Sequence, residues 1–319
     1  MQRRMEGPDW AMLLGLALAF GSAFFFVHLG LRSFGPVSVG LGRVGIAACV
    51  LTAVALIRGR RFPSTRSTWL ALLVMGALNN AIPFSLISWS QLRIDSGLAA
   101  ILNATTPIFT VLFAHLVGDE NLTLRRVAGV LLGFLGVGVL IGPAALARFD
   151  PTDLAEVAIL GAACSYAFAG LWGRRFRELP VEVAASGMLM GSTAILLPIA
   201  LVFEHPWTVQ LRLDSLAAIA ALAVIGTAIA YLLYFRLLAR VGPTNLLLVT
   251  FLLPVVALAL GAGFLGERVH PAELFGLLLI MAGLAAIDGR LVAYLGGKFR
   301  ATSPGAAATS GSPRNSRRS

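Results

Sequence analysis

One feature of this sequence limits its fold more than any other: the chain contains an internal duplication. Matching residues in its two halves stand a constant 147 positions apart. They are Arg93, Pro107, Glu120, Gly129, Gly136 and Gly142 in the first half, and Arg240, Pro254, Glu267, Gly276, Gly283 and Gly289 in the second. A repeat of this length predicts two structurally related halves. In an apolar chain, that construction is typical of secondary transporters.

The composition indicates what surrounds these halves. Of the 319 residues, 58% are hydrophobic and 13% are charged, and the mean hydropathy is +0.85. Soluble domains carry about 25% charged residues, so most of this surface must face lipid. The net charge of +10 comes from short basic clusters between apolar runs, and no basic face is interleaved with aromatic residues. We therefore expect a lipid bilayer as the environment and no nucleic acid partner.

The apolar runs predict ten transmembrane helices, because a helical span needs about 20 apolar residues. The runs are continuous rather than alternating, which argues against membrane strands. We expect an all-α integral membrane protein with two five-helix repeats, 10–142 and 154–288, and a disordered basic cytoplasmic tail over 301–319. The expected spans are 10–31, 37–57, 69–90, 97–117, 124–142, 154–173, 184–203, 214–237, 243–264 and 272–288.

The distribution of arginine predicts the orientation of these spans. With the N-terminus in the cytoplasm, nineteen of the 25 Lys and Arg residues fall on the cytoplasmic side and five on the opposite side. Because basic residues are enriched in cytoplasmic segments, both termini of this multi-pass cell membrane protein are expected there. Because each half has an odd number of expected spans, the second half enters the membrane in the orientation opposite to that of the first. The sequence thus predicts inverted repeats, whose substrate sites usually lie near the midplane between the halves.

The duplicated stretches resemble the EamA branch of the drug/metabolite transporter superfamily. The strongest similarity is in TPIFTVLFAHLVGDENLTLRRVAGVLLGFLGVGVLIG (106–142) and its counterpart LPVVALALGAGFLGERVHPAELFGLLLIMAGLAAIDG (253–289), each with a proline, a glutamate and a glycine-rich last helix. The opening run LALAFGSAFFFVHLGLRSFGP (16–36) and the segment Leu41-Gly42-Arg43 are also similar to that family. The resemblance covers about residues 10–290.

This resemblance implies a function without naming a substrate. It implies export or exchange of small metabolites such as amino acids, or efflux of drugs and other toxic compounds, across the inner membrane. The sequence departs from the family in two places. Phe20 stands where many relatives carry a tryptophan, and the second half has no intramembrane arginine that matches Arg43.

Arg43 is the one basic residue well inside an expected span. A charge inside the bilayer is costly, so its side chain should face protein or water and have a partner. It is a candidate contact for an anionic group such as a carboxylate. The alternative is an arginine that snorkels to the membrane interface and takes no part in transport.

Further polar side chains lie inside the expected spans, some at equivalent positions of the two halves. Asn80 matches Thr227, and Asn103 matches Thr250. Polar groups at equivalent depths suit a substrate cavity at the midplane, and helix–helix hydrogen bonding is the alternative. The candidate substrate-binding residues are Arg43, Asn80, Asn103, Thr106, Ser165, Tyr166, Thr227, Tyr231 and Thr250.

Residues that the halves share are expected to serve the scaffold. Pro107 and Pro254 predict matched kinks. Glu120 and Glu267 are expected to cap the helices that follow them. Glycines four residues apart, as at Gly129 and Gly133, permit close helix contact within the bundle or in a dimer seam. Substrate choice is then expected where the halves differ.

Other function classes lack support. A membrane-embedded enzyme is a distant alternative, because the sequence has no metal-ligand spacing and no Ser/His/Asp set. The absence of a P-loop argues against ATP-driven transport by this chain alone. Cys49 and Cys164 lie in apolar runs and are expected to be packing residues. We expect no catalytic residue, metal or cofactor, a small-molecule substrate, and a monomer or homodimer. No Asp or Glu lies in the middle of an expected span, so uniport, exchange or coupling without a buried carboxylate stay open.

Overall fold

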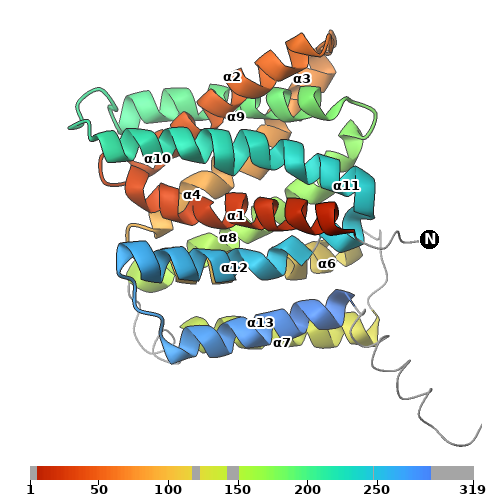
Figure 1. Ribbon diagram of the computed structural model, residues 1–319, viewed down its shortest axis with the longest axis vertical. Helices are drawn as coiled ribbons and strands as arrows, with labels where there is room; N and C mark the ends of the chain where they lie inside the picture. Colours follow the sequence, from red (N-terminus) through yellow and green to blue (C-terminus); the bar gives the residue numbers. More distant parts are fainter. Residues whose placement is uncertain (1–5, 117–122, 142–150, 247, 289–319) are drawn as a thin grey trace, which may run out of the picture.

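The computed structural model describes residues 6–116, 123–141, 151–246 and 248–288. Within these residues the chain forms helices and the turns between them, with no strand. The all-α expectation is therefore confirmed for the described part. Figure 1 shows the helices lying side by side in a bundle.

The described helices of the first half are α1 (Gly7–Gly30), α2 (Pro36–Ile57), α3 (Arg66–Gly76), the π-helical turn η1 (Ala77–Ala81), α4 (Ile82–Ser90), α5 (Ser96–Asn103), α6 (Thr106–Leu116) and α7 (Leu124–Ile141). Those of the second half are α8 (Pro151–Trp172), the 3-10 turn η3 (Gly173–Phe176), α9 (Val181–Phe203), α10 (Leu213–Ala223), the π-helical turn η4 (Val224–Ile229), α11 (Ala230–Leu246), α12 (Leu248–Leu260), the π-helical turn η5 (Gly261–Leu265) and α13 (Pro271–Asp288).

Eight helical stretches among the described residues are long and apolar enough to cross a membrane. They include the composite stretches Arg66–Ser90, Ser96–Leu116 and Leu213–Val241. The other two expected spans, 124–142 and 272–288, correspond to α7 and α13, whose apolar parts are shorter. Two arginines open α7, and Glu273 lies in the first turn of α13. The expected ten spans thus become eight full-length candidates and two shorter apolar helices.

The main helix contacts between the two halves come in equivalent pairs, in which the halves have swapped roles. The first helix of one half packs against the third stretch of the other: α1 against α10 and α11, and α8 against α4. The first helix also packs against the fourth stretch, α1 against α12 and α8 against α5 and α6. Equivalent helices pair directly, α2 with α9 and α7 with α13. In Figure 1, α1 accordingly lies between α10 and α12.

The pair α7 and α13 meets at a seam of glycines. A Cβ at Gly129 would lie 2.6 Å from the carbonyl oxygen of Gly283, and a Cβ at Gly136 would lie 2.8 Å from that of Gly276. Larger residues would therefore force these backbones apart. The order of the contacts shows that the two helices run antiparallel. This part of the glycine pattern serves packing inside the bundle, whereas Gly138 faces open space and Gly142 lies outside the described residues.

Two of the π-helical turns occupy equivalent positions. The turn η1 begins at Ala77 and η4 begins at Val224, 147 positions later. Each interrupts a long span in its middle, and the sequence pattern did not predict either turn. A π-helical turn changes the backbone hydrogen-bond register and is frequent at functional sites. Asn80 lies in η1, and its counterpart Thr227 lies in η4.

The equivalent prolines differ in their local structure. At Pro107 the span is interrupted, because α5 ends at Asn103 and α6 begins at Thr106. Pro254 instead lies inside α12, whose helical residues continue on both sides of it. The expectation of matched kinks is not met at the level of helix boundaries. One physical difference is the pair of threonines before Pro107, whose hydroxyls donate to backbone carbonyls within their own turn.

Glu267 caps a helix, but not the expected one. Its carboxylate accepts hydrogen bonds from the backbone N–H of Ser96 (2.9 Å), the backbone N–H of Gly97 (3.2 Å) and the Ser96 hydroxyl (2.9 Å), at the start of α5. The expectation that it caps the following helix, α13, is wrong. Gly266, with φ of 72°, reverses the chain direction after η5. The Glu267 carboxylate therefore lies beside Gly261, at the start of η5, and next to Ser96 of α5.

The same arrangement occurs at α2. The Glu204 carboxylate, just beyond the end of α9, accepts hydrogen bonds from the backbone N–H groups of Val37 (2.9 Å) and Ser38 (2.7 Å). Carboxylates at helix N-termini satisfy free N–H groups and complement the helix dipole. Each cap ties one half to the other. Glu120 and the tail 301–319 lie outside the described residues.

Candidate functional site

Arg43 reaches from α2 into the middle of the composite span Leu213–Val241. Its Nε donates a hydrogen bond to the Thr227 hydroxyl (2.8 Å), and its Nη2 donates to the carbonyl oxygen of Gly226 (3.3 Å). The guanidinium carbon lies 3.7 Å from the ring centroid of Phe84, a cation–π contact. Arg43 is therefore held by the π-helical turn of the opposite half.

The guanidinium keeps part of its hydrogen-bonding capacity. Of its three nitrogens, Nη1 has no hydrogen bond within the described part of the chain, and no carboxylate there forms an ion pair with Arg43. The side chain is half-buried rather than sealed. An arginine offers five N–H donors in a planar fork that matches a carboxylate. The arrangement can therefore take an anionic group from a bound molecule.

A second polar group lies at η1. Asn80 donates from its amide nitrogen to the Ser192 hydroxyl of α9 (2.9 Å), and its amide oxygen accepts from the Tyr231 hydroxyl of α11 (3.0 Å). The amide nitrogen of Asn79 lies 3.1 Å from that same hydroxyl oxygen. Asn80 and Ser192 are fully buried, whereas Asn79 and Tyr231 are half-buried. This group joins three helical stretches without a formal charge.

Tyr166 of α8 interacts with a member of each of these two polar groups. Its phenol interacts electrostatically with the Arg43 guanidinium and with Tyr231. Its ring packs against two separate apolar clusters of the bundle, one around Ile101 and one around Leu189. Its hydroxyl has no hydrogen bond within the residues that the structure covers, and the residue is half-buried. Tyr166 therefore offers a second donor next to Arg43.

The remaining candidates serve other contacts. Ser165 donates to the carbonyl oxygen of Leu78 in η1 (2.6 Å) and so stabilises the π-helical turn. Thr227 is fully buried and donates to the carbonyl oxygen of Leu222 (3.0 Å) in addition to accepting from Arg43. Such contacts match the alternative role of helix–helix hydrogen bonding.

Two candidates of the fourth stretch contact each other rather than Arg43. The Thr106 hydroxyl donates to the carbonyl oxygen of Asn103 (2.8 Å). The side-chain oxygen of Asn103 is buried without a partner among the described residues. Thr250, the counterpart of Asn103, lies in α12, which packs against α1 and α5. The structure therefore brings together Arg43, Asn80, Tyr166, Thr227 and Tyr231, but shows no contact from Asn103 or Thr106 to that group.

Sequence reasoning missed three partners at the site. Phe84 stacks on Arg43, the carbonyl of Gly226 accepts from it, and Ser192 pairs with Asn80. A signal for Phe84 existed, because its counterpart in the second half is Tyr231. A backbone carbonyl freed by a π-helical turn has no signature in the side-chain sequence. Within the described residues, no group of three or more His, Cys, Asp or Glu could hold a metal ion.

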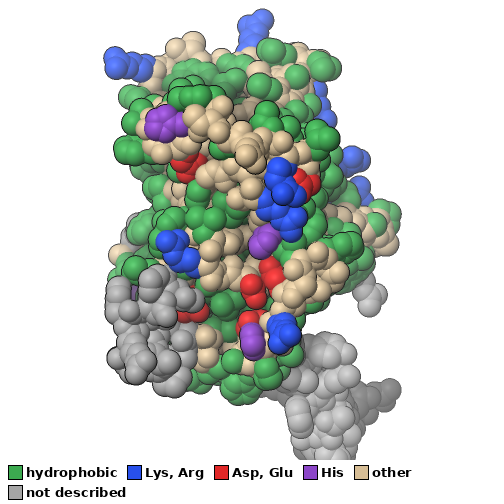
Figure 2. Space-filling view, turned by 90° about the vertical axis from the view of Figure 1, so that its left-hand side faces the viewer, with side chains coloured by type: hydrophobic (Ala, Val, Ile, Leu, Met, Phe, Trp, Pro, Cys, Tyr) green, Lys and Arg blue, Asp and Glu red, His purple; other side chains and the backbone are tan. Residues whose placement is uncertain are grey.

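The end of the bundle where α1 ends and α2 begins carries carboxylates and histidines, shown in Figure 2. Asp95, just before α5, interacts with Glu267, His28 and His270. Burial raises the pKa of the Asp95 carboxyl, and the neighbouring Glu267 raises it further, while the two histidines lower it. A titratable cluster thus surrounds the cap on α5.

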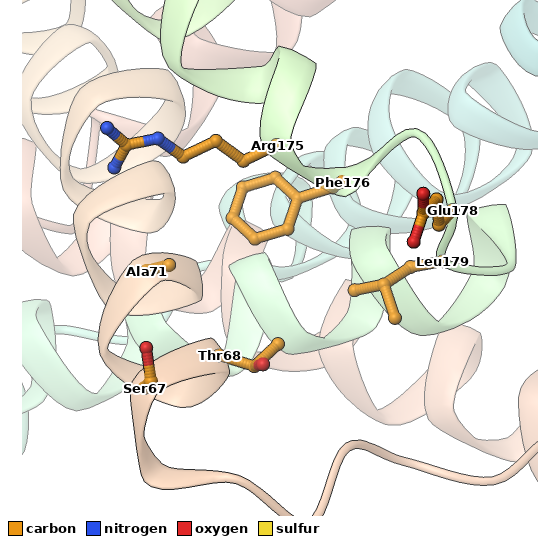
Figure 3. Close-up of a pocket in the computed structure, with 7 residues that line it drawn as sticks. All are labelled: Ser67, Thr68, Ala71, Arg175, Phe176, Glu178 and Leu179. Atoms are coloured by element: carbon orange, nitrogen blue, oxygen red, sulfur yellow. The ribbon is translucent and has the colours of Figure 1, made fainter.

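A separate pocket opens at the opposite end of the span Arg66–Ser90. It has a volume of about 360 Å³ and lies between the first turns of α3 and the turn that follows α8 (Figure 3). Its lining residues are Ser67, Thr68, Ala71, Arg175, Phe176, Glu178 and Leu179. None of them contacts Arg43, so this pocket is not part of the polar groups between the halves.

Comparison with known proteins agrees with this architecture. The model of the EamA-like transporter family matches residues 10–142 and 153–287. A solved crystal structure of 21% sequence identity superimposes with a TM-score of 0.64, covering 94% of this chain and all of that one. At that identity the likeness shows the fold alone.

Similar sequences include named transporters. An "uncharacterized inner membrane transporter", YedA of Escherichia coli K12, is 29% identical over 289 residues, 90% of this chain and 92% of its own length. A "probable terminal-alkyne amino-acid exporter" of Streptantibioticus cattleyicolor is 28% identical over 302 residues, 95% of this chain and 99% of its own length. Protein PecM of Dickeya dadantii is 27% identical over 237 residues, covering 74% and 78%.

Proposed function

The chain belongs to the EamA-like transporter family, and from that premise we propose that it exports or exchanges a small metabolite that carries a carboxylate, an amino acid or a related compound. Transport is secondary and proceeds by alternating access between the two halves. Because this is a family of transporters, the alternative of a membrane-embedded enzyme is set aside.

The observation that carries the proposal is the environment of Arg43. A cation at mid-span is costly unless it is paired and hydrogen-bonded. The acidic residues of the described helices lie in the first or second turn of their helices, apart from Asp288 at the last residue of α13, and none of the ion pairs among the described side chains involves Arg43. A substrate carboxylate fits the remaining N–H groups of Arg43, with the Tyr166 hydroxyl as a second donor. Tyr231 and Asn79, both half-buried, complete the contact surface.

The transport cycle that we propose uses all ten helices as two inverted repeats. The exchange-related packing and the antiparallel pairing of α7 with α13 support this arrangement. The arginine distribution supports cytoplasmic termini. Two similar proteins are named as an inner membrane transporter and as an amino-acid exporter, which supports an inner membrane location and an amino acid as substrate. A monomer or a homodimer remains a prediction.

Efflux of drugs is the second candidate. The aromatic side chains of Phe84, Tyr166 and Tyr231 beside Arg43 would suit an aromatic compound. Organic cations are disfavoured, because the polar groups around Arg43 include no carboxylate among the described residues. An anionic or zwitterionic compound is therefore favoured within this candidate as well.

The test combines growth and transport. Cells that overproduce the protein are challenged with a panel of amino acids, their analogues and drugs, and protection from one class identifies the substrate. Uptake of that substrate is then measured in proteoliposomes with the wild type and Arg43→Ala. We expect Arg43→Ala to abolish most uptake, whereas uptake at the wild-type rate would show that Arg43 is a structural residue.

A further inference from the structure

A second candidate binding site is the pocket between the start of α3 and the turn after α8. Two of its lining residues carry a charge, Arg175 in η3 and Glu178 two residues after η3. Figure 3 shows them on opposite sides of the pocket, with Phe176 between them. The ion pairs among the described side chains include neither Arg175 nor Glu178, and both residues are exposed. Opposite charges thus line one pocket without neutralising each other.

The arginine of this pocket is held in place by a tryptophan. The guanidinium carbon of Arg175 lies 3.5 Å from the ring centroid of Trp172, at the end of α8, in a cation–π contact. The indole nitrogen of Trp172 donates a hydrogen bond to the carbonyl oxygen of Ala71 in α3 (3.0 Å), so the two walls of the pocket are tied together. Because a cation–π contact uses the face of the guanidinium, the N–H donors in its plane stay available to an anion.

The surface of α3 changes from polar to apolar as it leaves the pocket. Ser67 and Thr68, in the first turn of α3, line the pocket. Leu70 and Val74 follow three and seven residues after Ser67, on the same face of the helix, and both are exposed. Within two turns, charged and hydroxyl groups thus give way to exposed apolar side chains. That order fits a molecule with a polar head and an apolar chain.

Two tryptophans indicate the depth of the pocket in the membrane. The indole of Trp69 donates to the carbonyl oxygen of Pro63 (2.9 Å) and stacks on Phe62, and the indole of Trp172 supports Arg175. Both tryptophans are half-buried. Because tryptophan is enriched at the level of the lipid head groups, the pocket lies where a head group would be. In the orientation proposed above, this is the cytoplasmic surface.

We propose that this pocket binds the head group of an aminophospholipid, with the phosphate at Arg175, the primary ammonium at Glu178 and an acyl chain along the exposed face of α3. The inference goes beyond the proposed function and does not depend on the transported substrate. Each charge of the head group meets an opposite charge, and hydrogen bonds between charged partners are the strong ones. A phosphatidylglycerol head group would leave Glu178 unpaired beside a negative phosphate. A choline head group has no N–H to donate to the carboxylate.

The test measures lipid binding and does not need a transported substrate. The purified full-length protein in detergent is incubated with equal amounts of phosphatidylethanolamine, phosphatidylcholine and phosphatidylglycerol that carry the same acyl chains. Native mass spectrometry then measures how much of each lipid the protein retains. We expect phosphatidylethanolamine to be retained about fivefold more than either of the others, the upper end for one exposed charge pair.

Variants of the pocket should change lipid retention in different ways. Glu178→Gln should remove the preference for phosphatidylethanolamine, because only this lipid pairs with the carboxylate. Arg175→Gln should lower the retention of all three lipids, because all three carry the phosphate. Ser67→Asp should lower it as well, and misfolding would not be the reason, because aspartate is favourable in the first turn of a helix. Arg212→Gln and Asp214→Asn remove the same charges from a surface ion pair elsewhere and serve as matched controls with unchanged retention.

A soluble head group separates a lipid from a free zwitterion as the ligand. Glycerophosphoethanolamine has the same charges without acyl chains, and at equal concentration it should not displace the bound phosphatidylethanolamine. Displacement would overturn the assignment of the pocket to a lipid.

The remaining outcomes test the aminophospholipid directly. Equal retention of the three lipids, stronger retention of phosphatidylglycerol, or a preference that survives Glu178→Gln would overturn the proposal. A loss in Arg212→Gln as large as in Arg175→Gln would do the same. These results are independent of the proposed function, because the metabolite panel and the uptake by Arg43 variants are measured separately from lipid retention.

Discussion

Each half places a helix against the π-helical turn of the other half, and the two contacts differ in charge. In one junction α2 presents Arg43 to η4, where Thr227 and Gly226 accept its hydrogen bonds. In the equivalent junction α9 presents the neutral Ser192 to η1, where Asn80 is the donor. The cationic junction is half-buried at Arg43, whereas Asn80 and Ser192 are fully buried.

This difference shows how a duplicated fold divides its tasks. The elements that recur are those that hold the bundle: the glycine seam, the exchange-related helix pairs and the two π-helical turns. The position of Arg43 is occupied by Met190 in the second half, and the position of Ser192 by Gly45 in the first. In the function proposed above, recognition of a charged substrate belongs to the first junction, whereas at the second junction Asn80 and Ser192 join two helices.

The largest expected effect comes from removing the cation. Arg43→Gln keeps a polar side chain but loses the charge, and loss of one partner of a buried charge pair costs about 2 to 5 kcal/mol, which is about thirtyfold or more in binding. Uptake into proteoliposomes should fall accordingly. Arg43→Lys should be intermediate, because it retains the charge and loses the fork.

The equivalent substitution in the other half is the matched control. Met190→Leu preserves volume at the position that corresponds to Arg43 and should leave uptake within about twofold of wild type. An equal loss of uptake in Met190→Leu and Arg43→Gln would contradict the claim that the two junctions have different roles.

The second effect concerns stability at the neutral junction. Asn80→Ala leaves the fully buried Ser192 hydroxyl and the Tyr231 hydroxyl without this partner, which should cost about 1 to 3 kcal/mol of the free energy of unfolding. Thermal unfolding in detergent should show a lower Tm than for the wild type. A variant with unchanged Tm and lost transport would instead assign Asn80 to substrate contact.

A smaller effect is expected at Tyr166. Tyr166→Phe keeps the ring in both apolar clusters and removes only the hydroxyl, whose net contribution to a bound anion is about 1 kcal/mol, roughly fivefold in affinity. Uptake at low substrate concentration should fall by that factor with Tm unchanged. A drop in Tm with unaltered uptake would make Tyr166 a packing residue.

The smallest effect is the pH dependence of stability that Asp95 contributes beside the cap on α5. Because the pKa of Asp95 is raised in the folded protein, its contribution to stability is present below the unfolded value and is lost as pH rises from about 3.8 through the folded pKa. Asp95→Asn should flatten this decline in Tm. An unchanged pH profile in Asp95→Asn would contradict the coupling to the Glu267 cap.

Much of the fold could be predicted from the sequence, because lipid imposes a simple rule on length and polarity. The helical class and the eight long apolar helices follow from continuous apolar runs, and the equivalent helix contacts of the two halves follow from the constant spacing. The two π-helical turns could not be predicted, because a continuous apolar run looks the same whether its backbone hydrogen bonds span four residues or five. The helix that Glu267 caps could not be predicted either, since α5 lies far from Glu267 in the sequence.

The candidate site was predicted in part. Arg43 stood out because a charge inside a span demands an explanation, and its counterpart in the other half is apolar. Asn103 and Thr106 were equally strong candidates by polarity, but the Thr106 hydroxyl bonds locally to the Asn103 carbonyl in the structure. Polarity alone marks a residue as unusual in a span, whereas burial and partners decide whether it joins helices or faces a substrate.

The most direct test of the asymmetric site is a double cycle between the protein and its substrate. Uptake of the amino acid identified by the growth panel is compared with inhibition by its amide, which lacks the carboxylate, in the wild type and in Arg43→Gln. If Arg43 binds the carboxylate, either change alone should weaken binding strongly, and both together should weaken it little more than one. Independent, additive losses would place the carboxylate elsewhere and contradict the role of Arg43.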